Sequence, residues 1–533
     1  MGGVPDSVAA IARTHQAVLE SRGVRTSHGA FYTPIHVAER IVDIALADRI
    51  ARIKGPQNLP RVIDPSCGTG NFLVVVALRL ADRMVELGAS ADDAITQVVS
   101  QCIHGVDIDP VAVALCREQL SALTNGRVPV DQLHDRITEG NPLLDRGSLY
   151  GFDVVVGNPP FLDQQSSSTT LSRDDHRAIS RTFGSRADAI NALTNPAAVF
   201  LLAALDMVTS DGVVAMLQPA SFLTSRDTGG VRAVLGGLSA AFDIWVTREQ
   251  VFDAAVHVCA VMVDQSRRTK VHVHAGEGEP IATETRVLSE RTWAFAPATL
   301  EGVPDIWIDE SNLLGFFCAV TADFRDQYYG LVGHVVDNAE PSDGDLRLVT
   351  SGLIDPFTCR WGAKPVRFAK SAYRNPVVTA ADLPPRMRDW ARSRAVPKVI
   401  VATQTRVIEA VVDPDGSLLP SVPVLTAMAM QEHDEWHILA ALMSPVASVV
   451  AARRHLGAGL SAGSIKMSAM DMGRLPAPTD IGTWHHGADL ARAIQLGDST
   501  DLELFGRTMC SAYGMSNADA DAAMKWWLPR VTR

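Results

Sequence analysis

The chain has 533 residues, of which 47% are hydrophobic and 20% are charged, and it carries a formal net charge of −12. This length exceeds what one hydrophobic core normally serves, so we expect two or three domains. The composition is that of a globular protein and excludes an extensively disordered chain. The acidic balance argues mildly against a nucleic-acid partner, although in a multidomain chain the placement of Lys and Arg matters more than their sum.

The seven cysteines are scattered, without CxxC pairs or Cys/His clusters at metal spacing. We therefore expect reduced cysteines and no metal site. The N-terminus lacks a basic segment followed by an apolar run, and no stretch approaches the roughly 18 apolar residues of a membrane helix. The sequence thus predicts a cytoplasmic protein that does not bind a membrane.

The sequence pattern divides the chain into five expected segments. Apolar strand-like runs alternate with amphipathic stretches from Phe31 to about Gln265, which predicts an α/β domain with a parallel sheet covered by helices. The polar sequence after Asp264 marks the exit from this domain. The other segments are a helical lead-in at 1–30, a connecting segment at 266–329, a mixed α+β domain at 330–480 and a helical segment at 481–533.

The first motif with chemical content lies at 62–73, Val-Ile-Asp-Pro-Ser-Cys-Gly-Thr-Gly-Asn-Phe-Leu. It is an apolar strand that breaks into a turn of small residues and then enters a helix. Gly68 and Gly70 allow backbone conformations that a side chain forbids, and the helix entry offers unpaired N–H groups. On its own the turn is either a ligand-binding loop or a structural turn.

The next strand ends in Gly-Val-Asp-Ile-Asp-Pro at 105–110. Asp107 lies just past the strand, where a carboxylate can accept both hydroxyls of a ribose bound across the strand ends. We expect Asp109 to cap the following helix instead. The two motifs in this order suggest a nucleoside ligand at the carboxyl edge of the sheet.

A third buried strand, from Phe152, ends in Asn158-Pro159-Pro160-Phe161. The prolines stiffen the loop and remove two donors, leaving the Asn158 amide oxygen and the Pro159 carbonyl as preorganised acceptors. Two such acceptors suit an amino group with two hydrogens, and would leave its nitrogen lone pair ready to attack an electrophilic methyl group. Phe161 can stack on the base that carries the amine.

In this order, the three motifs resemble those of the gamma-class adenine-specific DNA methyltransferases, specifically the TaqI-like group with a C-terminal target-recognition domain. The resemblance covers roughly Phe31 to Pro478. It implies a Rossmann-like methyltransferase sheet with helices on both faces at 31–265 and a DNA-binding target-recognition domain at 330–480. It also implies S-adenosylmethionine as cofactor and a flipped-out adenine in double-stranded DNA as substrate.

The resemblance assigns cofactor contacts along the first domain. Thr33, in Phe-Tyr-Thr-Pro, and Asp64 would face the methionine part, Asp107 would hold the ribose and Ile108 would pack on the cofactor adenine. Asn141 would bond that adenine, although the family often has Asp there. The expected cofactor-binding residues are Phe31, Tyr32, Thr33, Asp64, Ser66, Cys67, Gly68, Gly70, Asn71, Phe72, Asp107, Ile108, Asn141 and Pro142.

The expected catalytic residues are Asn158, Pro159, Pro160 and Phe161, with Phe252 as a second aromatic against the flipped adenine. Position 161 is Phe where many relatives carry Tyr, and since both rings stack we expect little effect. Residues 212–225 resemble the family's later strand and turn. The polar segment 162–195 is expected to close over the DNA.

Basic residues gather in the expected second domain, together with Trp361, Tyr373 and Trp390. They form clusters at 360–374, 386–394 and 398–406, and residues 457–466 and 475–476 resemble the closing part of a recognition domain. Such a collection indicates a DNA-facing surface. The expected DNA contacts are Arg360, Lys364, Arg367, Lys370, Arg374, Arg406 and Lys466.

Three other substrates remain open, because Asn-Pro-Pro-aromatic loops also act on cytosine N4, on guanine N2 of ribosomal RNA and on protein glutamine. Motif order and the long C-terminal region favour adenine. A relative that binds DNA without catalysis is a further alternative. Thirty residues before the first motif leave no room for a nuclease there, so we expect a separately encoded restriction endonuclease or defence-system subunits as partners.

Overall fold

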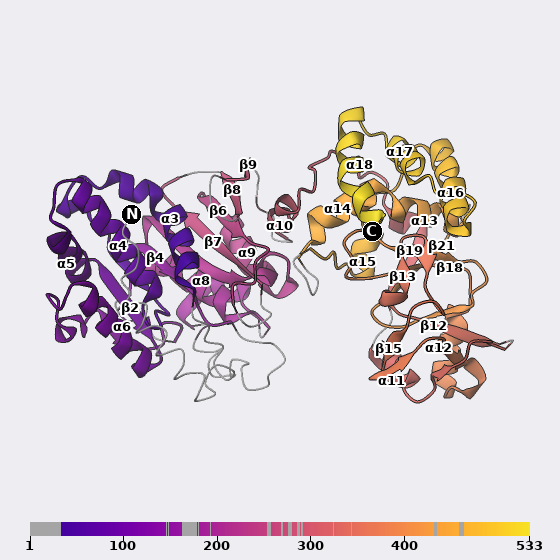
Figure 1. Ribbon diagram of the computed structural model, residues 1–533, viewed down its shortest axis with the longest axis horizontal. Helices are drawn as coiled ribbons and strands as arrows, with labels where there is room; N and C mark the ends of the chain where they lie inside the picture. The colour runs from indigo at the N-terminus through magenta and orange to yellow at the C-terminus, as the bar shows by residue number, and fades with distance from the viewer. Residues whose placement is uncertain are drawn as a thin grey trace. The chain divides into compact units, whose positions relative to one another are not determined.

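The chain forms two compact units, Met1–Ala296 and Pro297–Arg533, shown in the computed structural model of Figure 1. The expected lead-in at 1–30, Phe31, Tyr32 and most of the 162–195 segment lie outside the described residues. The structure describes residues 33–144, 147, 149–161, 179, 181–191, 193–252, 257–267, 270–275, 280–284, 288, 292–322, 325–342, 344–430, 434–457 and 463–532.

The first unit is built on one nine-stranded sheet. Its strands are β1 (Val62–Asp64), β2 (Ile103–Asp107), β3 (Ile137–Glu139), β4 (Phe152–Gly157), β5 (Val208–Pro219), β6 (Ala241–Val246), β7 (Val258–Asp264), β8 (Val271–Ala275) and β9 (Ala282–Glu284). Their order is β3-β2-β1-β4-β5-β7-β6-β8-β9. The first five strands pair in parallel, and β7 lies antiparallel between β5 and β6.

Helices cover both faces of this sheet. They are α3 (Ile35–Arg52), α4 (Asn71–Glu86), α5 (Ala91–Gln101), α6 (Pro110–Leu123), α8 (Pro196–Met207) and α9 (Gly229–Gly236), with short 3-10 turns η1 (Pro56–Asn58), η2 (Val130–Leu133), η3 (Gly184–Ala189), η4 (Ala220–Leu223) and η5 (Arg226–Thr228). Val62 and Val154 pack in one core with residues of α3, α4 and α6. Their strand neighbours Ile63 and Val155, which point to the other face, are fully buried too. The predicted α/β sheet with two covered faces is therefore confirmed.

The sheet continues past Gln265, where the sequence analysis placed the end of the domain. β8 pairs in parallel with β6, and β9 pairs with β8. Gln265, Ser266 and Arg267 form a turn after β7, the chain then re-enters the same sheet at β8, and the first unit ends at Ala296. A polar, turn-forming sequence looks alike in a linker and in a tight connection, so composition alone does not separate the two.

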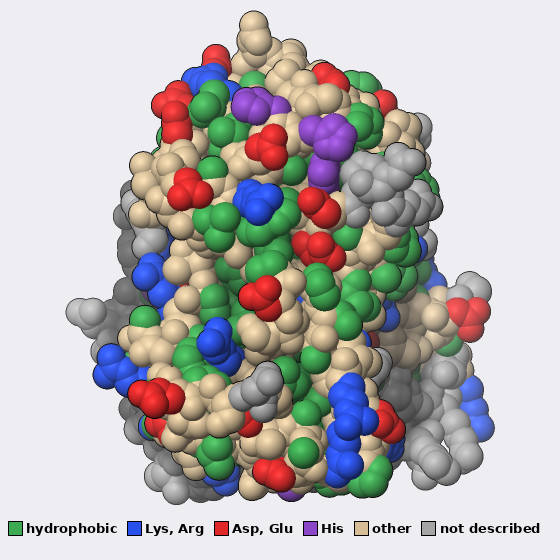
Figure 2. Space-filling view, turned by 90° about the vertical axis from the view of Figure 1, so that its right-hand side faces the viewer, with side chains coloured by type: hydrophobic (Ala, Val, Ile, Leu, Met, Phe, Trp, Pro, Cys, Tyr) green, Lys and Arg blue, Asp and Glu red, His purple; other side chains and the backbone are tan. Residues whose placement is uncertain are grey.

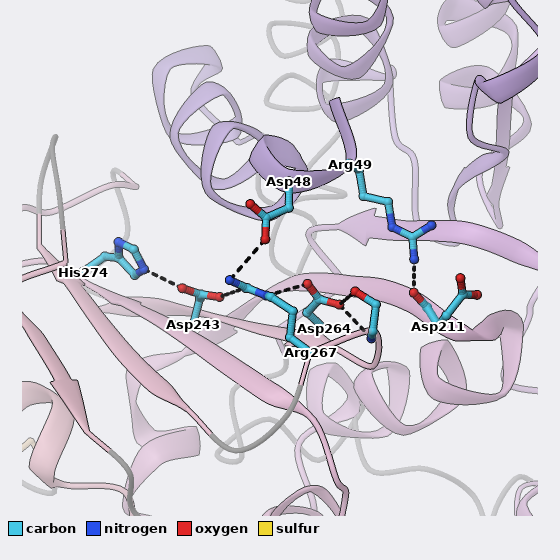
Figure 3. A network of polar contacts seen from close by, with 8 residues as sticks. Asp48, Arg49, Asp211, Asp243, Asp264, Arg267 and His274 are labelled. Carbon is cyan, nitrogen blue, oxygen red and sulfur yellow. Dashed lines mark hydrogen bonds and ion pairs between the residues drawn. The ribbon is translucent and has the colours of Figure 1, made fainter. Parts of the chain in front are cut away.

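A network of ion pairs connects α3 to the edge of the sheet where the parallel strands begin (Figure 3). Arg267 contacts Asp243 and Asp264 at 2.8 and 2.7 Å, and reaches Asp48 of α3 at 3.5 Å. His274 Nε2 lies 2.8 Å from Asp243 Oδ1. Both carboxylates that Arg267 bridges are nearly buried, so its charge compensates theirs.

The second unit is a mixed α+β structure. Its strands are β10 (Cys318–Ala322), β11 (Val336–Asp337), β12 (Asp345–Val349), β13 (Ile354–Asp355), β14 (Thr358–Cys359), β15 (Val366–Phe368), β16 (Ser371–Tyr373), β17 (Pro376–Thr379), β18 (Lys398–Val401), β19 (Ala410–Asp413), β20 (Leu418–Pro420) and β21 (Leu425–Ala429). They form two four-stranded sheets, β10-β21-β18-β19 and β11-β17-β12-β20, and two hairpins, β13–β14 and β15–β16.

The helices of the second unit pack in two cores: those from residue 435 onward lie against the first of these sheets, and those at 325–331 and 385–394 pack against the second. They are α11 (Arg325–Leu331), α12 (Pro385–Arg394), α13 (Glu435–Met443), α14 (Pro445–His455), α15 (Ala469–Gly473), α16 (Ile481–Leu496), α17 (Leu502–Ala512) and α18 (Asn517–Val531), with α10 (Phe295–Leu300) at the junction and the turns η6 (Leu314–Phe316), η7 (Ser351–Leu353) and η8 (Ala380–Asp382). Within the described ranges no single helix is long and apolar enough to cross a membrane; α13 and α14 pass that test only together, bent by 59°.

Candidate functional site

The three sequence motifs meet at the carboxyl edge of the nine-stranded sheet. β1 lies between β2 and β4, and all three strands run in parallel, with Ile63 beside both His104 and Val155. The turn after β1, the acidic residues at the end of β2 and the Asn-Pro-Pro loop after β4 therefore lie side by side at this edge of the sheet. This is the edge at which open parallel sheets bind ligands.

The turn after β1 depends on its glycines. Gly68 and Gly70 have φ angles of 54° and 97°, in the left-handed region. A Cβ at Gly70 would lie 2.7 Å from Cys116 Sγ of α6, so the turn has no room for a side chain there. Cys67 donates its backbone N–H to Val106 O of β2 at 3.0 Å. The turn is thus held by contacts with β2 and α6.

Asp107 connects this turn to the end of β2. Its carboxylate accepts from the backbone N–H groups of Gly68 at 2.8 Å and Asp109 at 2.9 Å. Burial raises the pKa of Asp107, and these hydrogen bonds lower it. Each carboxylate oxygen keeps acceptor capacity for a further donor.

Ile108 and Asp109, the two residues after Asp107, differ in exposure and in their contacts. Ile108 is 62% exposed, although an aliphatic side chain of this size gains from burial. Asp109 accepts from Val111 N at 2.9 Å and caps α6, as the sequence predicts. Ile108 therefore offers an apolar surface beside the Asp107 carboxylate.

Asp64 lies between the turn and the Asn-Pro-Pro loop. It is 2% exposed and accepts from Ser66 N at 2.9 Å and Ser66 Oγ at 3.4 Å. A Cβ at Gly157 would lie 2.5 Å from Asp64 Oδ1, so the carboxyl group packs directly on the residue before Asn158. Burial is the largest cause that raises the pKa of Asp64, to about 8, and the Asp107 charge raises it further.

The expected opening motif reaches the same turn. Asn71 Nδ2 donates to Thr33 O at 2.9 Å, and Thr33 and Phe72 are buried. Thr33 and Pro34 are the part of Phe-Tyr-Thr-Pro that the structure describes. Thr33 therefore joins the first helix of the sheet domain to the turn after β1.

Asn141 and Pro142 follow β3 at the outer side of this edge. The Asn141 Oδ1 atom accepts from Leu143 N at 3.1 Å, and Pro142 is buried. In this structure the Asn141 side chain shapes its own turn. The assignment of Asn141 to a cofactor base stays a prediction.

The Asn158–Phe161 loop brings two aromatic rings together. Phe161 contacts Phe252 edge to face, with ring centroids 6.1 Å apart. Each residue is 5% exposed, and Pro159 is buried beside them. Phe252 comes from the segment between β6 and β7, which the sequence assigned to the second aromatic from motif order alone.

The seven basic residues assigned to DNA are all exposed on the second unit. Arg360 pairs with Asp355 at 2.8 Å, whereas Lys364, Arg367 and Lys370 make no ion pair within the described part of this unit. On the face shown in Figure 2, Lys and Arg side chains stand mostly singly among acidic, apolar and uncharged side chains. Positive charge is thus local rather than spread over that face.

One member of the predicted basic clusters does not belong to a surface. Lys398 is fully buried, and its Nζ lies 2.5 Å from Asp413 Oδ2 across the β18–β19 pair. The sequence analysis included Lys398 in the DNA-facing cluster at 398–406, and the structure corrects this. The acidic partner is 15 residues away in sequence, so the sequence alone does not show that this lysine is buried in an ion pair.

Sequence reasoning also missed two residues that shape this edge. Gly157 was treated as part of the strand, but its missing side chain makes room for Asp64. Arg232 of α9 is fully buried and donates to Phe222 O and Ser225 O in the turn after β5. A lone Arg in the apolar stretch Val-Arg-Ala-Val-Leu was the signal available for it.

Residues 21–235 match the family model described as N-6 DNA Methylase. The chain is 27% identical over 207 residues to the Type II methyltransferase M.BstVI of Geobacillus stearothermophilus, covering 37% of this chain and 35% of that protein. It is 28% identical over 151 residues to the Type I restriction enzyme MjaIX methylase subunit of Methanocaldococcus jannaschii, covering 28% of this chain and 22% of that protein.

Among solved structures, the chain resembles the Type IIL restriction-modification enzyme MmeI in complex with DNA. The TM-score is 0.63 at 12% sequence identity, and the match covers 95% of this chain and 79% of that chain. This likeness shows a shared fold. The matched segments span only 35% and 22% of the two curated relatives.

Proposed function

We propose that the protein transfers a methyl group from S-adenosylmethionine to the exocyclic amino group of an adenine in double-stranded DNA, a proposal supported by the match of residues 21–235 to the family model described as N-6 DNA Methylase. The observation that carries this proposal is the position of Asn158–Phe161 at the end of β4, directly beside β1 and its Gly68–Gly70 turn. Placement in the gamma-class, TaqI-like group is part of the same proposal.

The carboxyl edge has the groups that a nucleoside sulfonium requires. Asp107 offers acceptor capacity for ribose hydroxyls, and exposed Ile108 offers an apolar face to an adenine ring. Asp64 is a buried acid suited to the ammonium of the methionine part. The backbone of Thr33 is linked to the turn after β1 by the hydrogen bond from Asn71. When bound there, S-adenosylmethionine would supply an electrophilic methyl group on sulfur.

The chain's own contribution to the transfer is positioning. The Asn158 amide oxygen and the Pro159 carbonyl would accept the two N–H bonds of the substrate amine and direct its lone pair. The Phe161–Phe252 pair would pack against the base. No strong base is required, because the product proton can leave after attack, so rate enhancement rests mainly on orientation and fixed dipoles.

The substrate amine lies inside a base stack, so the target nucleotide must rotate out, at a cost of a few kcal/mol. We assign DNA contacts and target recognition to the second unit, through the exposed Arg360, Lys364, Arg367, Lys370, Arg374, Arg406 and Lys466. A restriction-modification or phage-defence setting, with a separately encoded endonuclease or other subunits, completes the proposal. It is supported by the names of the curated relatives.

Long-read mapping of modified bases tests the activity. DNA from cells that express the wild type should carry N6-methyladenine at one short sequence, and the same DNA from cells with Asn158→Ala should not. Lys54→Ala, an exposed residue outside the site, serves as the matched control and should keep the modification. Methylcytosine at the motif would move the assignment to cytosine N4.

Two further outcomes would also overturn the adenine assignment. Methyl transfer from labelled S-adenosylmethionine to ribosomal RNA or to a protein, with DNA unmodified, would favour guanine N2 or glutamine as the substrate. Cofactor binding without transfer to any of these acceptors would identify a catalytically inactive DNA-binding relative.

A further inference from the structure

The turn that follows β5 lies next to the Asn158–Phe161 loop. β5 pairs in parallel with β4, and Gly157, the last residue of β4, is beside Met216. β5 then continues to Pro219 before the chain turns through η4 and η5. Residues 220–228, the β5 turn, therefore leave the same edge of the sheet as the proposed catalytic loop, one strand away.

A buried cation holds this turn from inside. Arg232 is fully buried, and its guanidinium donates to Phe222 O, to Ser225 O at 2.8 Å and to Thr228 Oγ1 at 2.7 Å. Burial lowers the pKa of Arg232 to about 10, so the side chain still carries its charge at neutral pH. Burying a charge is costly unless several groups solvate it, as these turn oxygens do.

Other segments fix two more carbonyl groups of the β5 turn. Asp227 O accepts from Thr194 Oγ1 at 2.9 Å and from Asn191 Nδ2 at 3.3 Å. Leu223 O accepts from Trp293 N at 2.6 Å. The backbone oxygens thus point inward to donors from three different parts of the chain, and the turn is held rigidly.

The side chains that the β5 turn leaves outward are Ser221 and Arg226, both exposed. Arg226 makes no ion pair within the described residues of the first unit. The acid on the same turn, Asp227, is half-buried and accepts from Ser225 Oγ at 3.5 Å. A guanidinium and a hydroxyl on a rigid turn suit a phosphate group, because the backbone that carries them is already ordered before binding.

We propose that the β5 turn is a phosphate-binding element for the DNA strand that enters the site, with Ser221 and Arg226 as its contacting groups and Arg232 as the positioning residue that sets its shape. The proposal rests on the DNA-modifying function proposed above and adds the part of the first unit that holds the substrate backbone. None of these three residues is assigned to the reacting amine or to the cofactor, so the effect should fall on DNA affinity rather than on cofactor binding.

Fluorescence anisotropy with a labelled duplex of mixed sequence, over a series of NaCl concentrations, tests this directly on the full chain. Arg226→Ala should weaken binding and lower the slope of log K against log[NaCl] by about 1, as expected for one lost phosphate contact. Arg52→Ala removes an exposed arginine from the last turn of α3, at the amino-terminal edge, and should leave the slope unchanged. S-adenosylmethionine affinity should stay within about twofold of wild type in both variants.

Arg232 is tested by a graded pair of substitutions. Arg232→Lys keeps the positive charge but loses the planar set of N–H donors of the guanidinium. It should raise the DNA dissociation constant less than Arg232→Met does, with cofactor affinity unchanged in each. If Arg232→Met does not fold, Arg226→Ala and Ser221→Ala still decide the matter. An Arg226→Ala protein with wild-type affinity and slope overturns the proposal, whereas a wild type that binds DNA but methylates nothing overturns the proposed function alone.

Discussion

Asp64 is the acid at this edge whose environment most opposes its charged form. Burial is the largest cause that raises its pKa to about 8 from the ordinary 3.8, and the charge of a second acid, Asp107, raises it further. An ammonium group placed against it would reverse this balance, since a nearby opposite charge favours the ionised carboxylate. Cofactor binding would then release a proton from Asp64.

This predicts that S-adenosylmethionine affinity rises with pH up to about 8, by close to tenfold per unit below that point. Above it the affinity should fall again, because an α-amino group loses its own proton near pH 8. Titration calorimetry in buffers of different ionisation enthalpy measures both the affinity and the proton released. Asp64→Asn should bind S-adenosylmethionine weakly, and its affinity should not rise with pH. Asp92→Asn, at a carboxylate paired with Arg127, should behave as wild type.

The raised pKa of Asp64 also makes the stability of the cofactor-free protein depend on pH. The folded pKa of Asp64 lies above its unfolded value, so the folded state binds the proton more tightly and loses stability as the pH rises from about 4 to about 8. Asp64→Asn should remove that part of the pH dependence. A proton-release signal that persists in Asp64→Asn would show that another group titrates on binding.

At the scale of elements, Arg267 links two strands of the sheet to each other and to Asp48 of α3. Its side chain is 35% exposed, while those of Asp243 and Asp264 are 10% and 8% exposed. Arg267→Ala should destabilise the first unit by about 2–3 kcal/mol, because two nearly buried carboxylates lose their main counter-charge. Urea denaturation measures the change, and Arg127→Ala, whose partners are exposed, should have a much smaller effect.

Within the second unit, we propose the β15–β16 hairpin as an element that contacts DNA. Its turn residues Ala369 and Lys370 both have positive φ, 47° and 70°, and Ala369 N donates to Tyr328 OH at 3.0 Å. This pinned, strained turn presents Lys370, with Arg367 and Lys364 close in sequence and each exposed. Strained backbone of this kind often accompanies a functional role.

Replacing Lys364, Arg367 and Lys370 together by Ala should lower the salt slope of duplex binding by about 2.7, as three lost phosphate contacts require. Arg360→Ala should change it less, because Arg360 is already paired with Asp355. The anisotropy assay described for the β5 turn measures both. Equal effects of the triple variant and of Arg507→Ala, which is paired with two acids on α17 and α18, would remove the hairpin from the DNA surface.

For the whole molecule, the sequence predicts what is locally encoded. The Gly68–Gly70 turn, the Asp109 cap and the strand that ends at Asn158 each depend on a few consecutive residues, and all are found. The Lys398–Asp413 pair, the contact of Gly157 with Asp64 and the addition of β8 to the sheet join residues far apart in sequence. Such contacts are set by packing, which no local pattern contains.

The division into two units leads to a prediction about unfolding. Each unit has its own hydrophobic core, so calorimetry of the full chain should show two transitions. S-adenosylmethionine at about 100 times its dissociation constant should stabilise the first unit by about 2.7 kcal/mol and raise its Tm by about 4 °C, leaving the other transition in place. Asn158→Ala should keep this shift and Asp64→Asn should lose it, because only the latter is assigned to the cofactor. A single transition that moves as a whole would mean that the units unfold together, and a shift confined to the second unit would place the cofactor away from the Gly68–Gly70 turn.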